Sequence, residues 1–458
     1  MANDPETAFK AYDIRGRVGL DIDADFAEAL GRAAVAVTSA CRVVVGGDAR
    51  ETSPDFKAAL ARGLIEAGAD VDDIGLCGTE EVYFATAHLG ADLGIMVTAS
   101  HNPIDYNGMK LVGAGAAPLS EEVFAALREA MLAGDALEAA EPGTRRDRAG
   151  TRAAYVDHVA GFVAPEALGP VKIVANAGNG SAGPTFDAIV EALTARGAAL
   201  EVIRVHHAPD AAFPNGIPNP LLPENHAATA DVVRAEGAAL GIAWDGDFDR
   251  CFFFDETGDF VAGEYVVGLL AQATLDREPG AKIVHDPRVE WNTRALVEGA
   301  GGAPVRSRTG HALIKAKMRA ENAAYGGEMS AHHYFRDFMF CDTGQIPWLL
   351  VLERMARTGK GLRALVREMR AAYPSSGEIN FRVGDAGAVM ARIEADYAAL
   401  PGVEIDRLDG LSLAFESWRF NLRRSNTEPL LRLNVETRGD PALLAAKVAE
   451  LTAAIMAE

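Results

Sequence analysis

Cysteine is scarce in this chain. Its four thiols, Cys41, Cys77, Cys251 and Cys341, are far apart in the sequence. No two of them form a CxxC pair, so we predict neither a zinc site of the usual spacing nor a disulfide framework. This cysteine usage is typical of a reducing compartment. We therefore expect a cytoplasmic protein whose thiols are unpaired and mostly buried.

Long apolar runs are also missing. No segment approaches the roughly eighteen uninterrupted apolar residues that indicate a membrane-spanning helix. The acidic start, residues 1–6, lacks the basic and then apolar order of a signal peptide. We expect neither a membrane partner nor a secretory signal.

Positive charge is in deficit. The 458 residues include 44 Lys and Arg against 65 Asp and Glu, a net charge of −21. Such a surface repels nucleic acid and anionic lipid, so we expect no nucleic-acid partner. It would also repel a phosphorylated substrate unless basic residues gather locally. They do so around residues 10–17 and again between Arg419 and Arg432.

The chain is too long for a single core, and its 49% apolar residues can fill several. Strand-like runs at 41–46, 93–97, 171–175, 239–244 and 282–285 alternate with alanine-rich helical stretches, which predicts βα units on mixed or parallel sheets. Shorter strands at 378–383, 411–415, 418–421 and 430–436, then a helix from Pro441, predict a small α+β domain. From the breaks near 141–150, 256–258 and 373–376 we place domains at 1–146, 147–257, 258–370 and 371–458.

A serine follows the apolar strand 93–97, in the turn Thr98-Ala99-Ser100-His101-Asn102-Pro103. The carboxyl edge of a parallel strand is where open α/β sheets bind ligands. The glycines of a hydrolase nucleophile elbow are missing, and we expect adjacent Ser100 and His101 not to align for proton transfer. Two interpretations stay open: a phosphate-accepting serine, or polar residues that only satisfy a turn.

Asn107-Gly108 is predicted to form a tight turn that returns Lys110 to the edge of the sheet that carries Ser100. A lysine there can bind phosphate as a point charge or assist proton transfer.

Three carboxylates alternate in Asp245-Gly246-Asp247-Phe248-Asp249-Arg250. This spacing puts them on one side of an extended segment, where hard oxygen ligands suit Mg²⁺ or Ca²⁺. A phosphoserine oxygen would complete a magnesium shell and favours Mg²⁺. The alternative is a solvated acidic turn, but the segment lies between two apolar strands, where unneutralised carboxylates are costly. Arg250 can hold a phosphate or orient the cluster.

Weaker patterns lie further along the chain. Glu328 and Ser330, two residues apart after Gly326-Gly327, suit vicinal sugar hydroxyls. Thr309-Gly310-His311 carries little signal alone. The segment 423–427, Arg-Arg-Ser-Asn-Thr, offers arginines, hydroxyls and amides to a phosphate, although it reads equally well as a surface hairpin.

In this order, these motifs resemble those of the α-D-phosphohexomutase family, in its phosphomannomutase/phosphoglucomutase branch, over essentially the whole chain. Residues 98–103 resemble the family's phosphoserine loop, residues 245–250 its Mg²⁺ loop, and residues 327–330 its sugar-recognition loop. Arg423 with Ser425-Asn426-Thr427 resembles its phosphate-binding loop. The resemblance implies four domains around a central cleft, the first three sharing a mixed α/β topology and the last a small α+β domain.

The resemblance also implies an activity. Phosphate on Ser100 would pass to a hexose phosphate, and the resulting hexose 1,6-bisphosphate would reorient and return its other phosphate. Mg²⁺ would be held by Asp245, Asp247, Asp249 and phosphorylated Ser100, and the bisphosphate would serve as activator and intermediate. The implied catalytic residues are Ser100, Lys110, Arg15 and His101, with His101 shaping the loop. The implied substrate-binding residues are Tyr12, Arg250, Arg288, Thr309, Gly310, His311, Glu328, Ser330, His332, Arg423, Ser425, Asn426 and Thr427.

The sugar loop indicates the subtype. Glu328-Met329-Ser330 resembles enzymes that interconvert mannose 6-phosphate and mannose 1-phosphate for GDP-mannose biosynthesis, and that often accept glucose phosphates. The expected protein is a cytoplasmic isomerase, monomeric or homodimeric. The alternatives are a mutase that prefers glucose phosphates, a Mg²⁺-dependent sugar phosphatase, and a non-catalytic sugar-phosphate sensor.

Overall fold

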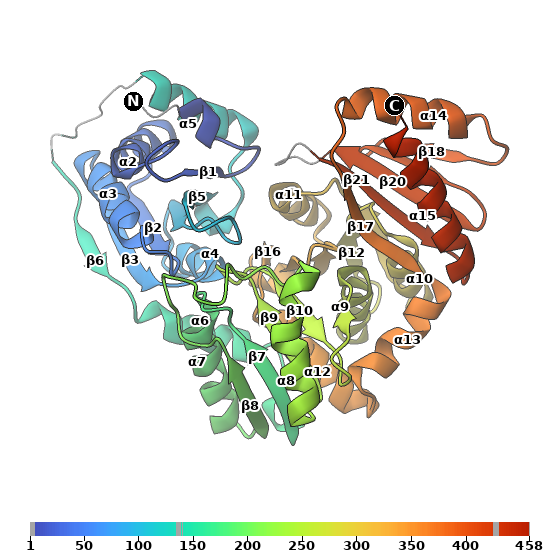
Figure 1. Ribbon diagram of the computed structural model, residues 1–458. Coiled ribbons are helices and arrows are strands. Elements are labelled where there is room, and N and C mark those ends of the chain that lie inside the picture. The colour runs from blue at the N-terminus through green and yellow to red at the C-terminus, as the bar shows by residue number, and fades with distance from the viewer. Residues whose placement is uncertain (1–4, 134–138, 140, 425–429, 458) are drawn as a thin grey trace. The chain divides into compact units, whose positions relative to one another are not determined.

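The computed structural model describes residues 5–133, 139, 141–424 and 430–457 (Figure 1). The chain forms two compact units. The first contains Met1–Phe260 and His332–Gly359, and the second contains Val261–Ala331 and Lys360–Glu458. None of the described helices combines the length and apolar character that crossing a bilayer requires.

A mixed sheet of order β1-β5-β4-β2-β3-β6 opens the first unit. Strands β2, β3, β4 and β6 are parallel, β5 pairs antiparallel with β4, and the edge strand β1 pairs antiparallel with β5. The strands are β1 Ile14–Arg17, β2 Arg42–Gly47, β3 Asp70–Leu76, β4 Leu93–Val97, β5 Tyr106–Gly113 and β6 Arg145–Asp147, and the helices are α1 Pro5–Ala8, α2 Ala24–Thr38, α3 Ser53–Glu66, α4 Thr79–His88 and α5 Glu121–Ala133.

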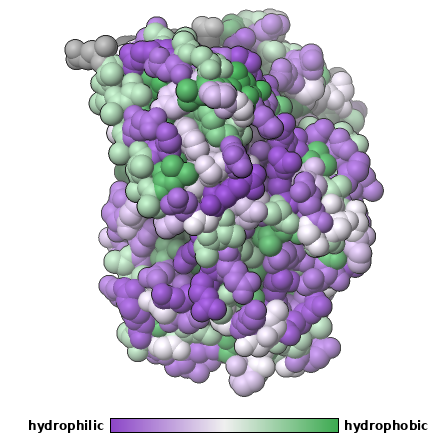
Figure 2. All heavy atoms as spheres, turned by 90° about the vertical axis from the view of Figure 1, so that its right-hand side faces the viewer, coloured by the Kyte–Doolittle hydropathy of each residue, from purple (hydrophilic) through white to green (hydrophobic). Residues whose placement is uncertain are grey.

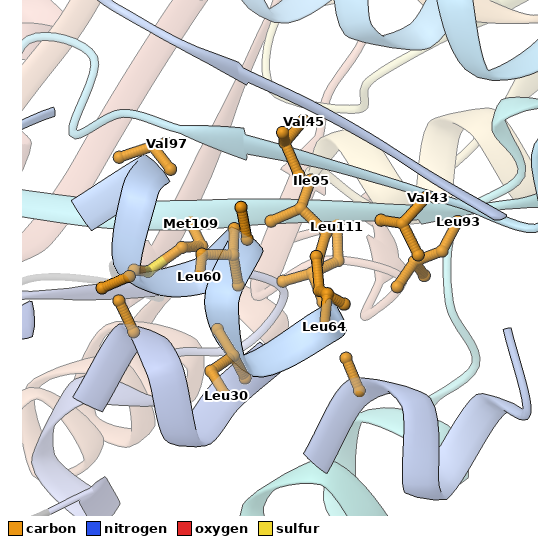
Figure 3. Packing of buried hydrophobic residues seen from close by; sticks show 14 of the residues in the cluster. Leu30, Val43, Val45, Leu60, Leu64, Leu93, Ile95, Val97, Met109 and Leu111 are labelled. Carbon is orange, nitrogen blue, oxygen red and sulfur yellow. The ribbon is translucent and has the colours of Figure 1, made fainter. Parts of the chain in front are cut away.

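The core of this sheet follows from its β-branched strands. Side chains of β2, β4 and β5 meet Leu30 of α2 and Leu60 and Leu64 of α3 (Figure 3). Removing such apolar surface from water is the main stabilising term in folding. The predicted strand 93–97 is confirmed, whereas part of the predicted linker 141–150 forms the edge strand β6.

A second mixed sheet, of order β11-β10-β9-β7-β8, completes most of the first unit. Strand β9 pairs in parallel with β7 and antiparallel with β10, so the chain reverses between β9 and β10. The elements are β7 Val171–Asn176, β8 Leu200–Val205, β9 Leu240–Trp244, β10 Cys251–Phe254, β11 Phe260–Val261, α6 Thr151–Ala160, α7 Ala182–Ala195 and α8 Ala227–Glu236. This unit also contains β15 His333–Phe335, β16 Cys341–Asp342 and α12 Ile346–Thr358.

The second unit begins with parallel strands in the order β13-β12-β14. Strand β12 spans Lys282–His285, as predicted, β13 spans Ala303–Arg306 and β14 spans Tyr325–Gly327. The helices of this part are α9 Gly263–Arg277, α10 Trp291–Gly299, α11 His311–Glu321 and α13 Leu362–Ala372.

An antiparallel sheet, of order β17-β21-β20-β19-β18, forms the rest of the second unit. Its strands are β17 Ser375–Phe381, β18 Glu404–Asp406, β19 Leu411–Ala414, β20 Trp418–Arg424 and β21 Leu431–Thr437, with α14 Ala386–Ala398 and α15 Pro441–Met456. The predicted α+β segment and its last helix are confirmed, and β18 is an additional edge strand. Figure 2 shows a face where hydrophilic residues predominate and hydrophobic ones are scattered.

Candidate active site

Ser100 lies in the loop that follows β4, and it is almost fully buried. Its φ of 49° is in the left-handed region, which is uncommon for serine. The Oγ hydroxyl donates a hydrogen bond to Asp245 Oδ2 over 2.7 Å. A Cβ at Gly246 would lie 2.5 Å from the Ser100 carbonyl oxygen, so glycine allows the two loops to approach this closely.

His101 lies closer to the serine than predicted. Its Nδ1 is 3.0 Å from Ser100 Oγ, although the serine hydroxyl donates its proton to Asp245 and not to this nitrogen. Because the serine proton is directed at Asp245, and Arg250 donates to the same Nδ1, the imidazole is an acceptor within a network. Desolvation, followed by the charges of Arg250 and Arg15, lowers the pKa of His101.

The loop between β9 and β10 brings the three predicted carboxylates together. Asp245, Asp247 and Asp249 are buried, and each offers an oxygen within 4.8 Å of the others. Lys110 Nζ donates to Asp247 Oδ2 at 2.8 Å and to Asp249 Oδ2 at 2.5 Å. The Oδ1 atoms of Asp247 and Asp249 are buried without a hydrogen-bond partner among the described residues. Buried, unpartnered carboxylate oxygens in this arrangement fit a hard divalent cation.

The charged groups of this cluster shift one another's pKa values. Burial, followed by the Asp247 carboxylate, raises the pKa of Asp249. Burial disfavours the charged form of Lys110, but Asp247 and Asp249 outweigh it and raise the pKa of this lysine. Close carboxylates cannot all stay charged without cations beside them. The cluster is therefore arranged to hold positive charge.

Lys110 reaches the cluster by a different route from the predicted one. Asn107 and Gly108 lie inside β5 and do not form a turn. A Cβ at position 108 would lie 2.0 Å from the Ile14 carbonyl oxygen, so this glycine permits close strand packing. The chain reverses earlier, before Tyr106, and the strand then carries Lys110 back along the sheet.

Other predicted residues of the first unit surround these loops. Arg15 on β1 donates to Asp13 and, through Nη1, to Asn102 Oδ1 at 2.5 Å. Arg250 Nε donates to Asp245 Oδ2 at 2.8 Å. Tyr12 is half-buried just before β1.

His332 joins the carboxylates of the first unit. Its Nε2 is 3.8 Å from Asp249 Oδ1, and His332, Asp249 and Asp342 form a second group of close metal-ligand atoms. Asp342 is ten residues after His332 in the sequence, whereas Asp249 is 83 residues before it.

A second cluster of predicted residues lies in the second unit. Glu328, after β14, is buried and its Oε1 accepts a hydrogen bond from the Gly310 amide at 3.0 Å. Arg288 forms an ion pair with Asp286 at 2.8 Å and lies 3.8 Å from Glu328. Burial opposes the charge of Asp286, but Arg288 outweighs it and lowers the pKa of that carboxyl.

Three arginines of this unit share one carboxylate. Arg288 and Arg423 each lie 3.4 Å from Glu378 Oε2, and Arg432 lies 3.1 Å from Oε1. Three guanidinium groups converging on one anion form a suitable phosphate cradle. The predicted residues Ser425, Asn426 and Thr427 lie outside the described residues.

Three further predicted residues flank Glu328 in the sequence or the fold. Thr309 is buried and its amide donates to Asp409 at 3.1 Å. His311 begins α11, and Ser330 is half-buried two residues after Glu328. The structure thus groups most of the predicted residues that it describes into one cluster within each unit.

Residues that support the loop of Asp245, Asp247 and Asp249 had been missed in the sequence. Thr79, at the start of α4, donates to Asp247 Oδ2 at 2.6 Å, and its amide donates to the Asp247 carbonyl. Asp48 and Arg50 follow β2 and contact the serine loop. All three come directly after parallel strands, as Ser100 does, so their place at the carboxyl edge was a usable signal.

Comparison with known proteins covers nearly all of the chain. The chain matches four family models, which are described as phosphoglucomutase/phosphomannomutase alpha/beta/alpha domain I (residues 6–138), domain II (153–258), domain III (262–373) and C-terminal domain (378–454). A phosphomannomutase of Salmonella montevideo is 55% identical over 97% of this chain and 98% of its own length. A protein of Xanthomonas campestris pv. campestris named "Phosphohexose mutases" is 54% identical over 97% of this chain and 98% of its own. A crystal structure of a phosphoglucomutase/phosphomannomutase family protein from Burkholderia thailandensis has a TM-score of 0.88 at 32% identity, covering 99% of this chain and 98% of that one.

Proposed function

The chain belongs to the phosphoglucomutase/phosphomannomutase family, and from this membership we propose that it is a phosphomannomutase. The reaction interconverts mannose 6-phosphate and mannose 1-phosphate through phosphorylated Ser100 and a hexose 1,6-bisphosphate. The observation that carries the proposal is the buried Ser100 hydroxyl, hydrogen-bonded to a carboxylate of a cation-binding cluster.

We assign the metal site to Asp245, Asp247, Asp249 and an oxygen of phosphorylated Ser100. A bound Mg²⁺ would withdraw charge from the phosphoryl group that is transferred. The two unpartnered Oδ1 atoms support this assignment, since they are hard donors that nothing described satisfies.

The side chains around Ser100 then have separate tasks. Lys110 is held in its charged form by two carboxylates, so it can stabilise the charge of the phosphoryl group. Arg15, oriented by Asp13, adds a second positive charge. Arg250 binds both Asp245 and His101, which keeps the Asp245 carboxylate beside the Ser100 hydroxyl.

We propose that the second unit recognises the rest of the substrate. Glu328 and Ser330 would bind sugar hydroxyls, with Thr309, Gly310 and His311 beside them. Arg423 and Arg288 would bind the phosphate that is not reacting, with Ser425, Asn426 and Thr427. Tyr12 and His332 are assigned to substrate binding on the resemblance alone.

The proposed domains are 1–146, 147–257, 258–370 and 371–458. The cytoplasmic location and a monomeric or homodimeric state stay predictions.

The decisive experiment incubates Mg²⁺-loaded protein with mannose 1-phosphate and a trace of hexose 1,6-bisphosphate. We expect mannose 6-phosphate and little free phosphate; a sugar phosphatase would instead release phosphate at least as fast as it formed isomer. Intact-mass analysis should show a single adduct of about 80 Da on Ser100. The same assay with glucose 1-phosphate measures the turnover of glucose phosphates. Absence of any isomer from either sugar phosphate would contradict the proposal.

A prediction follows for the phosphate cradle. Arg423→Gln should raise KM for the hexose phosphate about 10- to 100-fold, because it removes a charged hydrogen bond to the phosphate. Arg424→Gln is the matched control, since Arg424 is the next residue of β20 and is exposed. Equal KM values in the two variants would contradict the assignment.

A further inference from the structure

Arg50, which follows β2, gathers the backbone of the serine loop around its side chain. Its guanidinium is 1% exposed. Nη2 donates to the carbonyl oxygens of Ser100 at 2.9 Å and Asn102 at 2.6 Å. Nη1 donates to those of Pro103 at 2.8 Å and Tyr106 at 3.0 Å. One side chain thus donates hydrogen bonds to four backbone carbonyls within residues 100–106.

Asp48 connects Arg50 to Thr98, the residue that binds the Ser100 amide. Its Oδ1 accepts hydrogen bonds from the Arg50 amide at 3.0 Å and from Ser53 Oγ at 2.5 Å. Its Oδ2 accepts from Thr98 Oγ1 at 2.8 Å and lies 3.6 Å from Arg50 Nε. Thr98 Oγ1 in turn accepts the Ser100 amide at 2.8 Å. Both the amide and the carbonyl of Ser100 are therefore held by the Asp48–Arg50 pair.

These contacts act on the atoms that the reaction uses. A left-handed φ at a serine persists only where the surroundings enforce it, and here they do so from both sides of the residue. The Ser100 carbonyl is fixed between Arg50 and Gly246, which sets the distance from the loop to the metal cluster. Asn102, whose carbonyl Arg50 binds, accepts a hydrogen bond from Arg15 through its side chain.

We propose that Arg50 is a positioning residue for phosphoryl transfer, with Asp48 as its anchor: it sets the backbone of residues 100–106 so that Ser100 faces the metal cluster and Asn102 orients Arg15. The inference rests on the proposed mutase function. Arg50 touches neither substrate nor transferring phosphate in this role. Only a planar guanidinium offers two separate NH₂ groups to two pairs of carbonyls; a lysine ammonium offers three donors from one atom.

The test compares Arg50→Lys with Arg42→Lys. Arg42 lies on the same strand, β2, and its guanidinium binds Asp72 and the Leu89 carbonyl. Arg50→Lys should lower kcat about 100-fold, the order expected when a reacting group is misplaced by about 1 Å. KM for mannose 1-phosphate should stay within a few-fold, and Mg²⁺ binding by calorimetry should persist. Hydrogen exchange of the amides of residues 99–106 should accelerate in Arg50→Lys and not in Arg42→Lys.

A second pair of measurements guards against misfolding of the lysine variant. Asp48→Asn should show the same pattern, a lower kcat with faster exchange in the loop, to a smaller degree. In Arg50→Ala, millimolar guanidinium ion should restore part of kcat, and ammonium ion should not. A kcat unchanged in both Arg50→Lys and Asp48→Asn, or equal losses in Arg50→Lys and Arg42→Lys, would overturn the inference. Wild-type protein without mutase turnover would instead refute the proposed function, while the exchange data would still report on the loop.

Discussion

Replacing Ser100 with alanine is expected to lower mutase turnover by at least about 10⁴-fold, because the residue that we propose as the phosphoryl carrier is lost and no other described group replaces it. The adduct of about 80 Da, which corresponds to one phosphoryl group, should disappear as well. A coupled assay for mannose 6-phosphate measures turnover, and intact-mass analysis measures the adduct.

Ser181→Ala is the matched control. Ser181 is another buried serine, beside a glycine turn after a parallel strand, and its hydroxyl has no hydrogen-bond partner among the described residues. It should keep wild-type turnover and adduct. A Ser100→Ala variant that remains phosphorylated or active would show that another residue carries the phosphate.

Asp247→Asn is expected to have the second-largest effect. Asp247 offers a buried oxygen to the proposed metal site and accepts hydrogen bonds from both Lys110 and Thr79. The loss of one carboxylate should weaken Mg²⁺ binding by at least about 100-fold. Turnover at fixed Mg²⁺ should fall by about 1000-fold, since charge stabilisation by the metal contributes several kcal/mol. Calorimetry with Mg²⁺ measures the binding directly, without reference to activity.

Asp255→Asn controls for the loss of a buried aspartate. Asp255 is fully buried just after β10, where it accepts hydrogen bonds from Thr257 and the Asp259 amide. This variant should be less stable but should bind Mg²⁺ as the wild type does. If Asp247→Asn bound Mg²⁺ equally well, the assignment of the cluster would be wrong.

Much of the fold was predictable, because β-branched runs such as Val43–Val45 and Ile95–Val97 have the length and composition of buried strands. The aspartate cluster was predictable too, since its three carboxylates are two residues apart in one segment. Asn107-Gly108 misled the prediction because such a pair usually marks a turn. Here the glycine is required by the packing of β5 on β1, a tertiary contact that the local sequence does not contain.

The support of the site was harder to predict. The partners of Arg50 are backbone carbonyl groups, which every residue carries. The sequence therefore contains no residue type that would identify these contacts. Thr79 and Asp247 are 168 positions apart, and only the folded chain brings them together. Similarly, Ser100 has a left-handed backbone where its side chain approaches His101. Serine usually avoids this conformation, so the sequence did not indicate it.

The contact of Lys110 with Asp247 and Asp249 means that the proposed metal ion would share these carboxylates with an ammonium group. The lysine binds their Oδ2 atoms, whereas their Oδ1 atoms have no hydrogen-bond partner among the described residues. We therefore expect a metal ion to bind beside the lysine without displacing it. Each of the two carboxylates would then bridge two cations, which favours its charged form.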